Sequence, residues 1–262
     1  MHLDKNRSAT SGKIASRLAK AALGTALLLG VGSMALAQNM VVRSTGPSAG
    51  SYPAGKKMAN DAKVTLKAQD QVTILTKSGT RVLKGPGTYS LAQGGGTASS
   101  ASGRLASFIN NRGSRTGAVR SAVGDAVEAP TNPSLWFLDM TKGGKFCVAD
   151  PNALVLWRPD YTGSATASIV EPANGNVTEI AWRKGSALKA WPKDVLPVTN
   201  GASYRLLGSS VSQSVEVNFV VLESEPADLA DAASVLIENG CEGQLDLLVE
   251  TANANSQDPD QG

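Results

Sequence analysis

The sequence predicts a mainly β protein that consists of a small antiparallel hairpin domain and a β-sandwich with a C-terminal α-helix. Three observations support this class. Short apolar and β-branched runs recur at regular spacing, Gly- and Pro-rich turns separate them, and one helical pattern with a stop signal follows near the end. Evenly spaced short strands are typical of hairpin sheets and sandwiches.

Residues 1–37 have the three parts of a secretory signal peptide. The start is basic, an apolar run extends from Ala21 to Met34, and Ala35-Leu36-Ala37 precedes Gln38. The apolar run is shorter than the roughly 20 residues of a membrane span. We therefore expect cleavage between Ala37 and Gln38, export to the periplasm or the medium, and no membrane-spanning segment afterwards. Retention of the segment as an anchor is the alternative.

Residues 38–93 are predicted to form a basic module of antiparallel hairpins. The expected strands are Met40–Arg43, Val64–Leu66, Val72–Leu75, Thr80–Leu83 and Thr88–Leu91. Turn residues separate them, as in Gly85-Pro86-Gly87. Few strands of this length make a sheet with a thin core, so we expect the module to pack on another part of the chain.

The run from Val64 to Leu91 resembles the β-rich periplasmic domain of FecR-type proteins. Val72-Thr73-Ile74, followed by Gly79-Thr80-Arg81-Val82-Leu83, carries the resemblance through its strand, glycine, strand pattern. The resemblance implies an envelope module used for signalling or scaffolding.

Residues 94–132 are predicted to be a Gly/Ser- and Arg-rich linker that contains a short helix. Gly94–Gly103 is of low complexity, which is typical of a flexible linker. Leu105, Phe108 and Ile109 follow at helical spacing, so the helix is expected to extend to Asn111.

Residues 133–250 are predicted to form an acidic β-sandwich. The eight expected strands are Leu135–Leu138, Lys145–Ala149, Leu154–Arg158, Ala165–Val170, Val177–Trp182, Ala187–Trp191, Ser203–Leu207 and Val215–Leu222. The stretch from Val198 to Leu206 resembles the turn and strand of fibronectin-like and immunoglobulin-like domains. This likeness concerns architecture alone, because such folds host many functions.

A helix over residues 226–239 is predicted after the sandwich. Pro226 suits a first helical turn, and Gly240 is a stop signal. A last strand is expected over Leu245–Val249, and residues 251–262 are predicted to be a disordered polar tail.

The chain has two cysteines, Cys147 and Cys241, and we predict a disulfide between them. Disulfides persist in the compartments to which exported proteins are delivered. A bond here would tie the predicted helix to the sandwich, since Cys241 directly follows Gly240. Two separately buried thiols are the alternative.

The charge of the chain divides near residue 124. Once residues 1–37, with five Lys/Arg and one Asp, are set aside, 20 basic and 21 acidic residues remain. Residues 38–124 hold 12 of the basic and two of the acidic ones, for a net charge of +10, whereas residues 125–262 hold 8 and 19, for −11. A surface of one sign attracts oppositely charged partners. The alternatives are that the two halves dock on each other or that the charges are simply solvated.

Residues 71–124 contain no acid, and their basic residues are the candidates for binding an anion or partner. These candidates are Lys77, Arg81, Lys84, Arg104, Arg112, Arg115 and Arg120. Nucleic acid is not an expected partner, because Tyr89 and Phe108 are the two aromatic residues in this stretch that could stack on bases.

The sequence does not predict an enzyme. The one histidine, His2, lies in the predicted signal peptide, so the exported chain lacks the base of most serine hydrolases. Gly46-Pro47-Ser48-Ala49-Gly50 fits a nucleophile elbow but is followed by turn residues where a helix is required. Ser186 and Lys189 have dyad spacing but lie in an expected strand, where residues three apart point to opposite faces. No cofactor and no metal site are predicted.

These observations predict an exported, non-catalytic binding, scaffold or sensing module of the cell envelope. Its basic module is expected to contact an envelope protein or a polyanion. A carbohydrate-binding or glycan-active protein is the first alternative, because the second half holds all four tryptophans and many carboxylates. A purely structural envelope protein, in which the two charged halves clasp each other, is the second.

Overall fold

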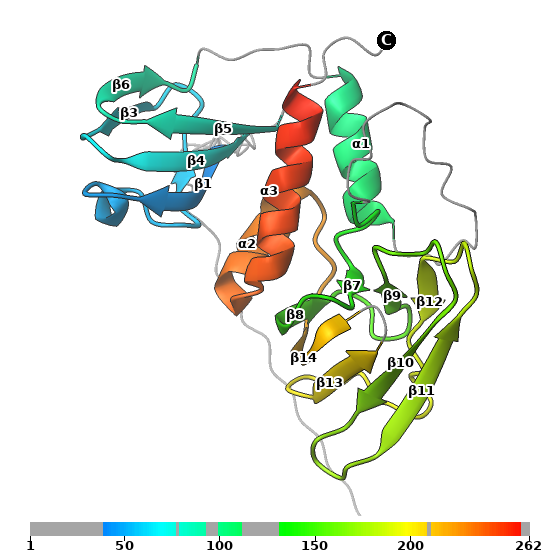
Figure 1. Cartoon of the computed structure of the whole chain (residues 1–262). Helices are drawn as coiled ribbons and strands as arrows, with labels where there is room; N and C mark the ends of the chain where they lie inside the picture. The colour runs from blue at the N-terminus through cyan, green and yellow to red at the C-terminus, as the bar shows by residue number, and fades with distance from the viewer. Residues whose placement is uncertain (1–38, 77–78, 93–98, 112–130, 209–210, 258–262) are drawn as a thin grey trace, which may run out of the picture. The chain divides into compact units, whose positions relative to one another are not determined.

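The computed structural model of the protein describes residues 39–76, 79–92, 99–111, 131–208 and 211–257 (Figure 1). The mainly β fold is confirmed, with four sheets and the C-terminal helices α2 and α3. The predicted signal peptide, including Ala37 and Gln38 at its cleavage site, lies outside the described residues. Among those residues, no helix has the length and apolar content needed to cross a membrane.

The β-module comprises the described residues from 39 to 92. Its strands are β1 (Asn39–Thr45), β2 (Lys57–Met58), β3 (Lys63–Leu66), β4 (Gln71–Thr76), β5 (Gly79–Lys84) and β6 (Gly87–Ser90), with a short 3₁₀ turn η1 (Ala49–Ser51). All five predicted strands are present. One sheet has the order β2-β1-β4-β5, and the other is the pair β3-β6. All pairs within the β-module are antiparallel, as predicted.

Alternation of buried and exposed residues builds the core of the β-module between its two sheets. Val64 and Leu66 of β3 are buried against Val72 and Ile74 of β4. Their neighbours in β3 are exposed. A strand whose apolar residues recur with period two buries one face in this way.

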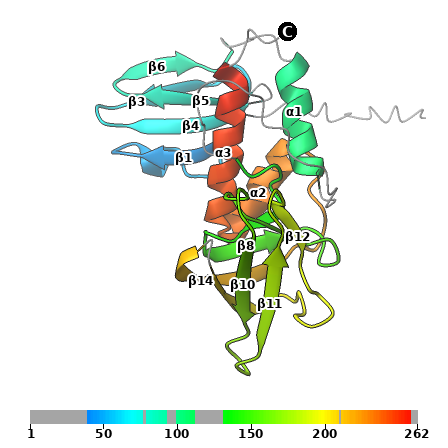
Figure 2. The ribbon, with the colours of Figure 1, turned by 45° about the vertical axis from the view of Figure 1, so that its right-hand side comes forward.

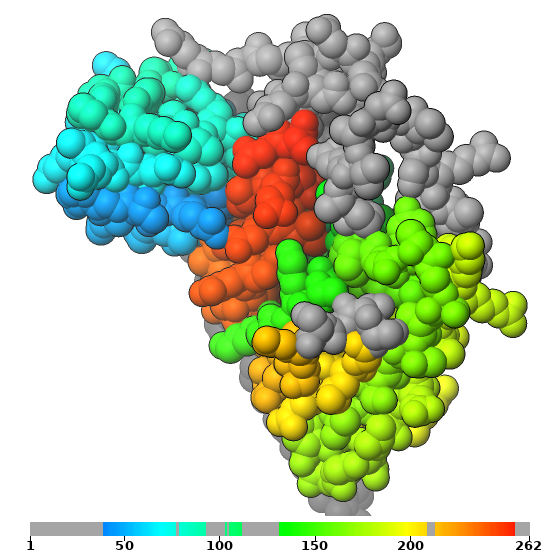
Figure 3. All heavy atoms as spheres, viewed as in Figure 1, coloured from blue at the N-terminus to red at the C-terminus, as the bar shows by residue number. Residues whose placement is uncertain are grey.

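The other face of the larger sheet packs on the C-terminal helices. Met40 and Leu75, which are opposite each other in β1 and β4, belong to the same apolar cluster as Leu236 of α2 and Leu248 of α3. The thin sheet therefore packs on another part of the chain, as expected. Figures 2 and 3 show α3 alongside β5.

The sandwich contains all eight predicted strands. They are β7 (Phe137–Asp139), β8 (Gly144–Val148), β9 (Val155–Trp157), β10 (Ala165–Val170), β11 (Val177–Trp182), β12 (Leu188–Ala190), β13 (Ser203–Gly208) and β14 (Val211–Val221). One sheet has the order β11-β10-β13-β14-β8 and the other the order β12-β9-β7. Leu156 of β9 and Leu206 of β13, both fully buried, meet in the core between them.

Two strand pairs of the sandwich run parallel, namely β14 with β8 and β7 with β9. Immunoglobulin and fibronectin sandwiches consist of antiparallel sheets. The chain therefore departs from the predicted architectural likeness at these two pairs.

Helix α1 (Ser99–Asn110) begins within the stretch predicted to be a flexible linker. The predicted helix is present, but it starts earlier than Leu105, so Ser99–Gly103 is helical rather than flexible. Leu105, Phe108 and Ile109 are buried in the cluster around α2 and α3. This tertiary contact stabilises the helix over residues 105–110, because burial of an apolar face outweighs weak local propensity.

Helix α2 (Leu229–Asn239) begins three residues after the predicted start at Pro226. Asp228 is the N-cap, since its carboxylate accepts hydrogen bonds from the backbone N–H groups of Ala230 and Asp231, both at 2.9 Å. Gly240 ends the helix in the left-handed conformation, with φ of 69°. The predicted stop is confirmed.

Helix α3 (Glu242–Gln257) replaces the strand predicted over Leu245–Val249 and the first part of the tail predicted over 251–262. Both predictions were wrong for these residues, while residues 258–262 lie outside the described part. Cys241, Leu248 and Ala252 are fully buried at spacings of seven and four residues, which is the period of a helix face. A short apolar run does not by itself distinguish the two structures.

The predicted disulfide between Cys147 and Cys241 is confirmed. It joins β8, at the edge of the larger sandwich sheet, to the start of α3. Gln244 reinforces the junction. Its Oε1 accepts from the backbone N–H of Cys147 at 2.6 Å, and its Nε2 donates to the carbonyl oxygens of Cys147 and Leu135, both at 3.0 Å. The amide thus completes hydrogen bonds that the edge strand would otherwise lack.

Candidate functional site

The predicted anion-binding residues are described only in part. Arg81 and Lys84 both lie on β5. Lys84 is exposed, whereas Arg81 is half-buried and donates from Nη1 to the Ser90 carbonyl oxygen at 3.4 Å. The backbone of Arg104 is in α1 and its side chain is not described. Outside the described residues are Lys77, Arg112, Arg115 and Arg120. Of the seven candidates, Arg81 and Lys84 are therefore the two whose side chains the structure describes, and both lie on β5.

A basic face at β3 was not predicted from the sequence. Lys63 and Lys67 are exposed on either side of Thr65, while the intervening residues are buried. The Thr65 hydroxyl lies 3.1 Å from that of Thr88 on β6, so a hydroxyl pair stands between the two lysines. We call Lys63 and Thr65 of β3, together with Lys67 directly after the strand, the β3 lysine face. The alternation of polar and apolar residues in this strand is the signal that could have predicted it.

Asp70 is a buried carboxylate of the β-module. It is 2% exposed, and its carboxylate accepts from the backbone N–H groups of Ser48 at 2.8 Å and Lys67 at 2.5 Å. Burial alone would raise the pKa of Asp70, but hydrogen bonds from Ser48 and Lys67 and the charge of Lys67 together lower it. Asp70 is thus a structural carboxylate that ties two turns together, and Asp61 is the exposed acid among the described residues of the β-module.

Packing of the β-module on the helices leaves most of its charge unpaired. The contact is largely apolar, with Met40 and Val42 directed at α2 and α3. Arg43 forms an ion pair with Asp246 of α3. This contact therefore leaves most of the described basic side chains of the β-module without an acidic partner on the helices.

The four tryptophans belong to the cores. Trp136, Trp157, Trp182 and Trp191 are between 4% and 5% exposed. Trp191 packs edge-on against Tyr204, with ring centroids 5.1 Å apart. The hypothesis of a carbohydrate-binding protein is therefore not supported by an exposed tryptophan ring.

Arg158 is a buried cation with a structural task. It is 2% exposed, and it donates from Nε to the Ser186 carbonyl oxygen at 2.8 Å and from Nη2 to those of Gly163 at 2.7 Å and Arg183 at 3.1 Å. Burial lowers the pKa of Arg158, and nearby Asp160 partly opposes that shift. The guanidinium joins the loops on either side of β10 and β11.

The motif matches from the sequence have no catalytic arrangement. Ser48 is buried beside Asp70 in a turn that leads into η1 and not into an α-helix. The Ser186 hydroxyl donates to the Leu188 carbonyl oxygen at 3.2 Å, and Lys189 is exposed on β12.

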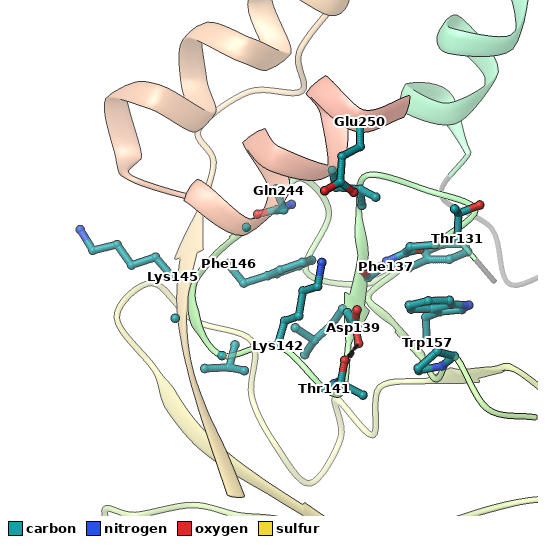
Figure 4. Close-up of a pocket in the computed structure, with 18 residues that line it drawn as sticks. Thr131, Phe137, Asp139, Thr141, Lys142, Lys145, Phe146, Trp157, Gln244 and Glu250 are labelled. Carbon is teal, nitrogen blue, oxygen red and sulfur yellow. Dashed lines mark hydrogen bonds between the residues drawn. The ribbon is translucent and has the colours of Figure 1, made fainter. Parts of the chain in front are cut away.

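A cavity of about 290 Å³ lies between the sandwich and the first turns of α3 (Figure 4). Phe137, Phe146 and Trp157 contribute an aromatic wall. Lys142, from the turn between β7 and β8, and Glu250 of α3 lie at the rim, and both are exposed. Figure 4 shows the ends of these two side chains directed into the same space. The cavity thus combines an apolar wall with one charge of each sign at this part of its rim.

Several other polar groups of the cavity form hydrogen bonds within the protein. Asp139 Oδ1 accepts from the backbone N–H of Thr141 at 2.8 Å and from its hydroxyl at 2.7 Å. The Lys145 ammonium lies beside the C-terminal end of α2, since a methyl group added to Gly240 would be 3.7 Å from Nζ. A helix C-terminus favours a cation. Asp139 keeps its negative charge because Thr141 is neutral, whereas Lys142 and Glu250 are charged groups at the rim whose side chains form no hydrogen bond or ion pair among the described residues.

No protein-family model, curated protein or solved structure matches this chain. The resemblance to FecR-type domains therefore stays a prediction.

Proposed function

We propose that the protein is an exported, non-catalytic binding module of the cell envelope that serves as a scaffold or sensor. In this proposal the β-module contacts an anionic or acidic partner, while the sandwich and helices hold it in place. The signal-peptide pattern supports export, and the disulfide between Cys147 and Cys241 is consistent with it, because such bonds persist in oxidising compartments.

One observation carries the binding role, namely that the β-module keeps its positive charge on its surface. Lys63, Lys67 and Lys84 are exposed and form no ion pair with an acid among the described residues. Asp70, the one buried acid nearby, is occupied by backbone N–H groups. Exposed cations raise the local concentration of anions and speed their association.

Charge reversal on the β3 lysine face tests the proposal. The double variant Lys63→Glu/Lys67→Glu should lose retention on a heparin column and sedimentation with envelope vesicles. The control Lys184→Glu/Lys189→Glu makes the same change in net charge at exposed positions of the sandwich. Binding by the unmodified protein should weaken as salt rises beyond about 0.15 M, where the Debye length is about 8 Å. Equal loss in both double variants, or binding that salt does not affect, would contradict the proposal.

A purely structural role is the second candidate, and the apolar packing of the β-module on the helices favours it. Met40 and Leu75 share one cluster with Leu236 and Leu248. On this hypothesis, Leu248→Ala would destabilise the protein by about 2 to 5 kcal/mol, and neither lysine variant would change binding to vesicles or heparin.

A further inference from the structure

We propose that the cavity between the β7–β8 turn and α3 binds a small zwitterion of the amino-acid type that has an apolar side chain. Lys142 would receive the carboxylate of the ligand and Glu250 its ammonium group. The aromatic wall of Phe137 and Trp157 would take the apolar side chain. This site is separate from the β-module, so the proposal does not depend on the proposed function.

The size of the cavity favours a small ligand. Pockets for organic ligands have volumes of about 300 to 1,000 Å³, and the volume here, about 290 Å³, is at the lower end of that range. A single amino acid or a short peptide terminus is therefore a better match than a nucleotide or an oligosaccharide.

The two charges at the rim favour a ligand with one charge of each sign. Lys142 and Glu250 come from different elements, and neither forms an ion pair with any other described residue. A ligand with a single charge would pair with one of these two side chains and would place its apolar part against the other. Covering a charged group without a partner costs free energy, so a zwitterion satisfies this rim better than a simple acid or amine.

Two of the remaining polar groups of the wall form hydrogen bonds within the protein. Thr141 occupies one oxygen of Asp139, and the Gln244 amide is fully engaged with Cys147 and Leu135. These groups set the shape of the wall. Beside them, Phe137 and Trp157 line the cavity although they are only 2% and 5% exposed, and aromatic side chains pack favourably on such rings.

Calorimetric titration of the purified protein with four probes tests the proposal. Phenylalanine carries both charges and an aromatic side chain, 3-phenylpropanoate lacks the ammonium group, phenethylamine lacks the carboxylate, and glycine lacks the side chain. Phenylalanine should bind, and each of the other three should bind about tenfold or more weakly. Equal affinity for phenylalanine and the two singly charged probes would overturn the proposal. So would the absence of saturable binding of phenylalanine at about 10 mM.

Two variants assign the charges. Lys142→Met should remove the preference for phenylalanine over phenethylamine, and Glu250→Gln should remove its preference over 3-phenylpropanoate. Lys189→Met, an exposed change on β12 outside the cavity, is the matched control and should leave all affinities within about twofold. Each altered side chain is exposed, and circular dichroism verifies that each variant is folded. Phenylalanine binding that survives both cavity variants unchanged would place the ligand elsewhere and refute the assignment.

Discussion

Replacing Gln244 with methionine removes three hydrogen bonds at one buried point while nearly preserving the volume of the side chain. The Gln244 amide is bonded to the N–H and carbonyl groups of Cys147 and to the carbonyl oxygen of Leu135, at 2.6 to 3.0 Å. Gln244 is 4% exposed, so water does not readily replace these partners. The substitution therefore leaves one donor and two acceptors of the backbone unsatisfied.

The expected loss follows from those three groups. Each buried polar group that loses its partner costs about 1 kcal/mol or more, so Gln244→Met should lower the free energy of unfolding by about 3 kcal/mol. That is a large share of the roughly 5 to 15 kcal/mol by which a typical domain is stable.

Urea unfolding followed by tryptophan fluorescence, without reductant, measures this loss. The midpoint should fall while the slope with denaturant stays constant, because the exposed area does not change. Gln71→Met, at an exposed position of β4, is the control and should change stability by less than about 0.5 kcal/mol. A loss below about 1 kcal/mol for Gln244→Met would refute the reasoning, since the three backbone groups must then have found other partners.

Three further predictions concern buried interactions. The double variant Cys147→Ala/Cys241→Ala should lose up to about 4 to 5 kcal/mol of stability, because the bond closes a loop with a sequence separation of 94 residues. Arg158→Lys should cost about 2 to 3 kcal/mol, because one ammonium group cannot reproduce the directed bonds of the guanidinium to three carbonyl oxygens. The stabilising effect of the Asp70 carboxylate should be fully present above its ordinary pKa of about 3.9 and lost as the pH falls through its lower folded value.

Each of these predictions has its own check. Reduction of the unmodified protein should reproduce the cysteine variant, and equal stability with and without reductant would contradict the first. Arg205→Lys, at an exposed position of β13, is the control for Arg158 and should be near neutral. For Asp70, acid unfolding of the protein is compared with that of Asp70→Asn. A difference in stability that does not narrow as the pH falls below about 4 would contradict the assigned direction of the pKa.

Period-two patterns determined most strands from sequence alone. β10 and β11 begin and end at the predicted residues, Ala165–Val170 and Val177–Trp182. These strands are bounded by turns and have one buried face, so the signal is local. The pairing of the strands is not local. The two parallel pairs, β14 with β8 and β7 with β9, join strands that are not neighbours in the chain. No local residue pattern predicts this pairing.

The candidate sites were likewise predicted only in part from the sequence. The distribution of charged residues along the sequence predicted a basic module. Which of these charges are exposed depends on burial in the fold, since Asp70 is buried while Lys63 and Lys67 are exposed. The cavity was not predicted at all. It requires Lys142 from a sandwich turn and Glu250 from a helix whose first part had the pattern of a strand.

The sequence by itself determined the mainly β class, the strand positions, the disulfide partners and the division of charge, because composition and short periodic patterns encode these properties. Tertiary structure alone decided that Leu245–Val249 is helical, that Gln244 bonds the edge of β8, and that all four tryptophans are buried. These outcomes depend on what each side chain contacts across the fold. Burial of apolar surface between distant segments then outweighs local preference.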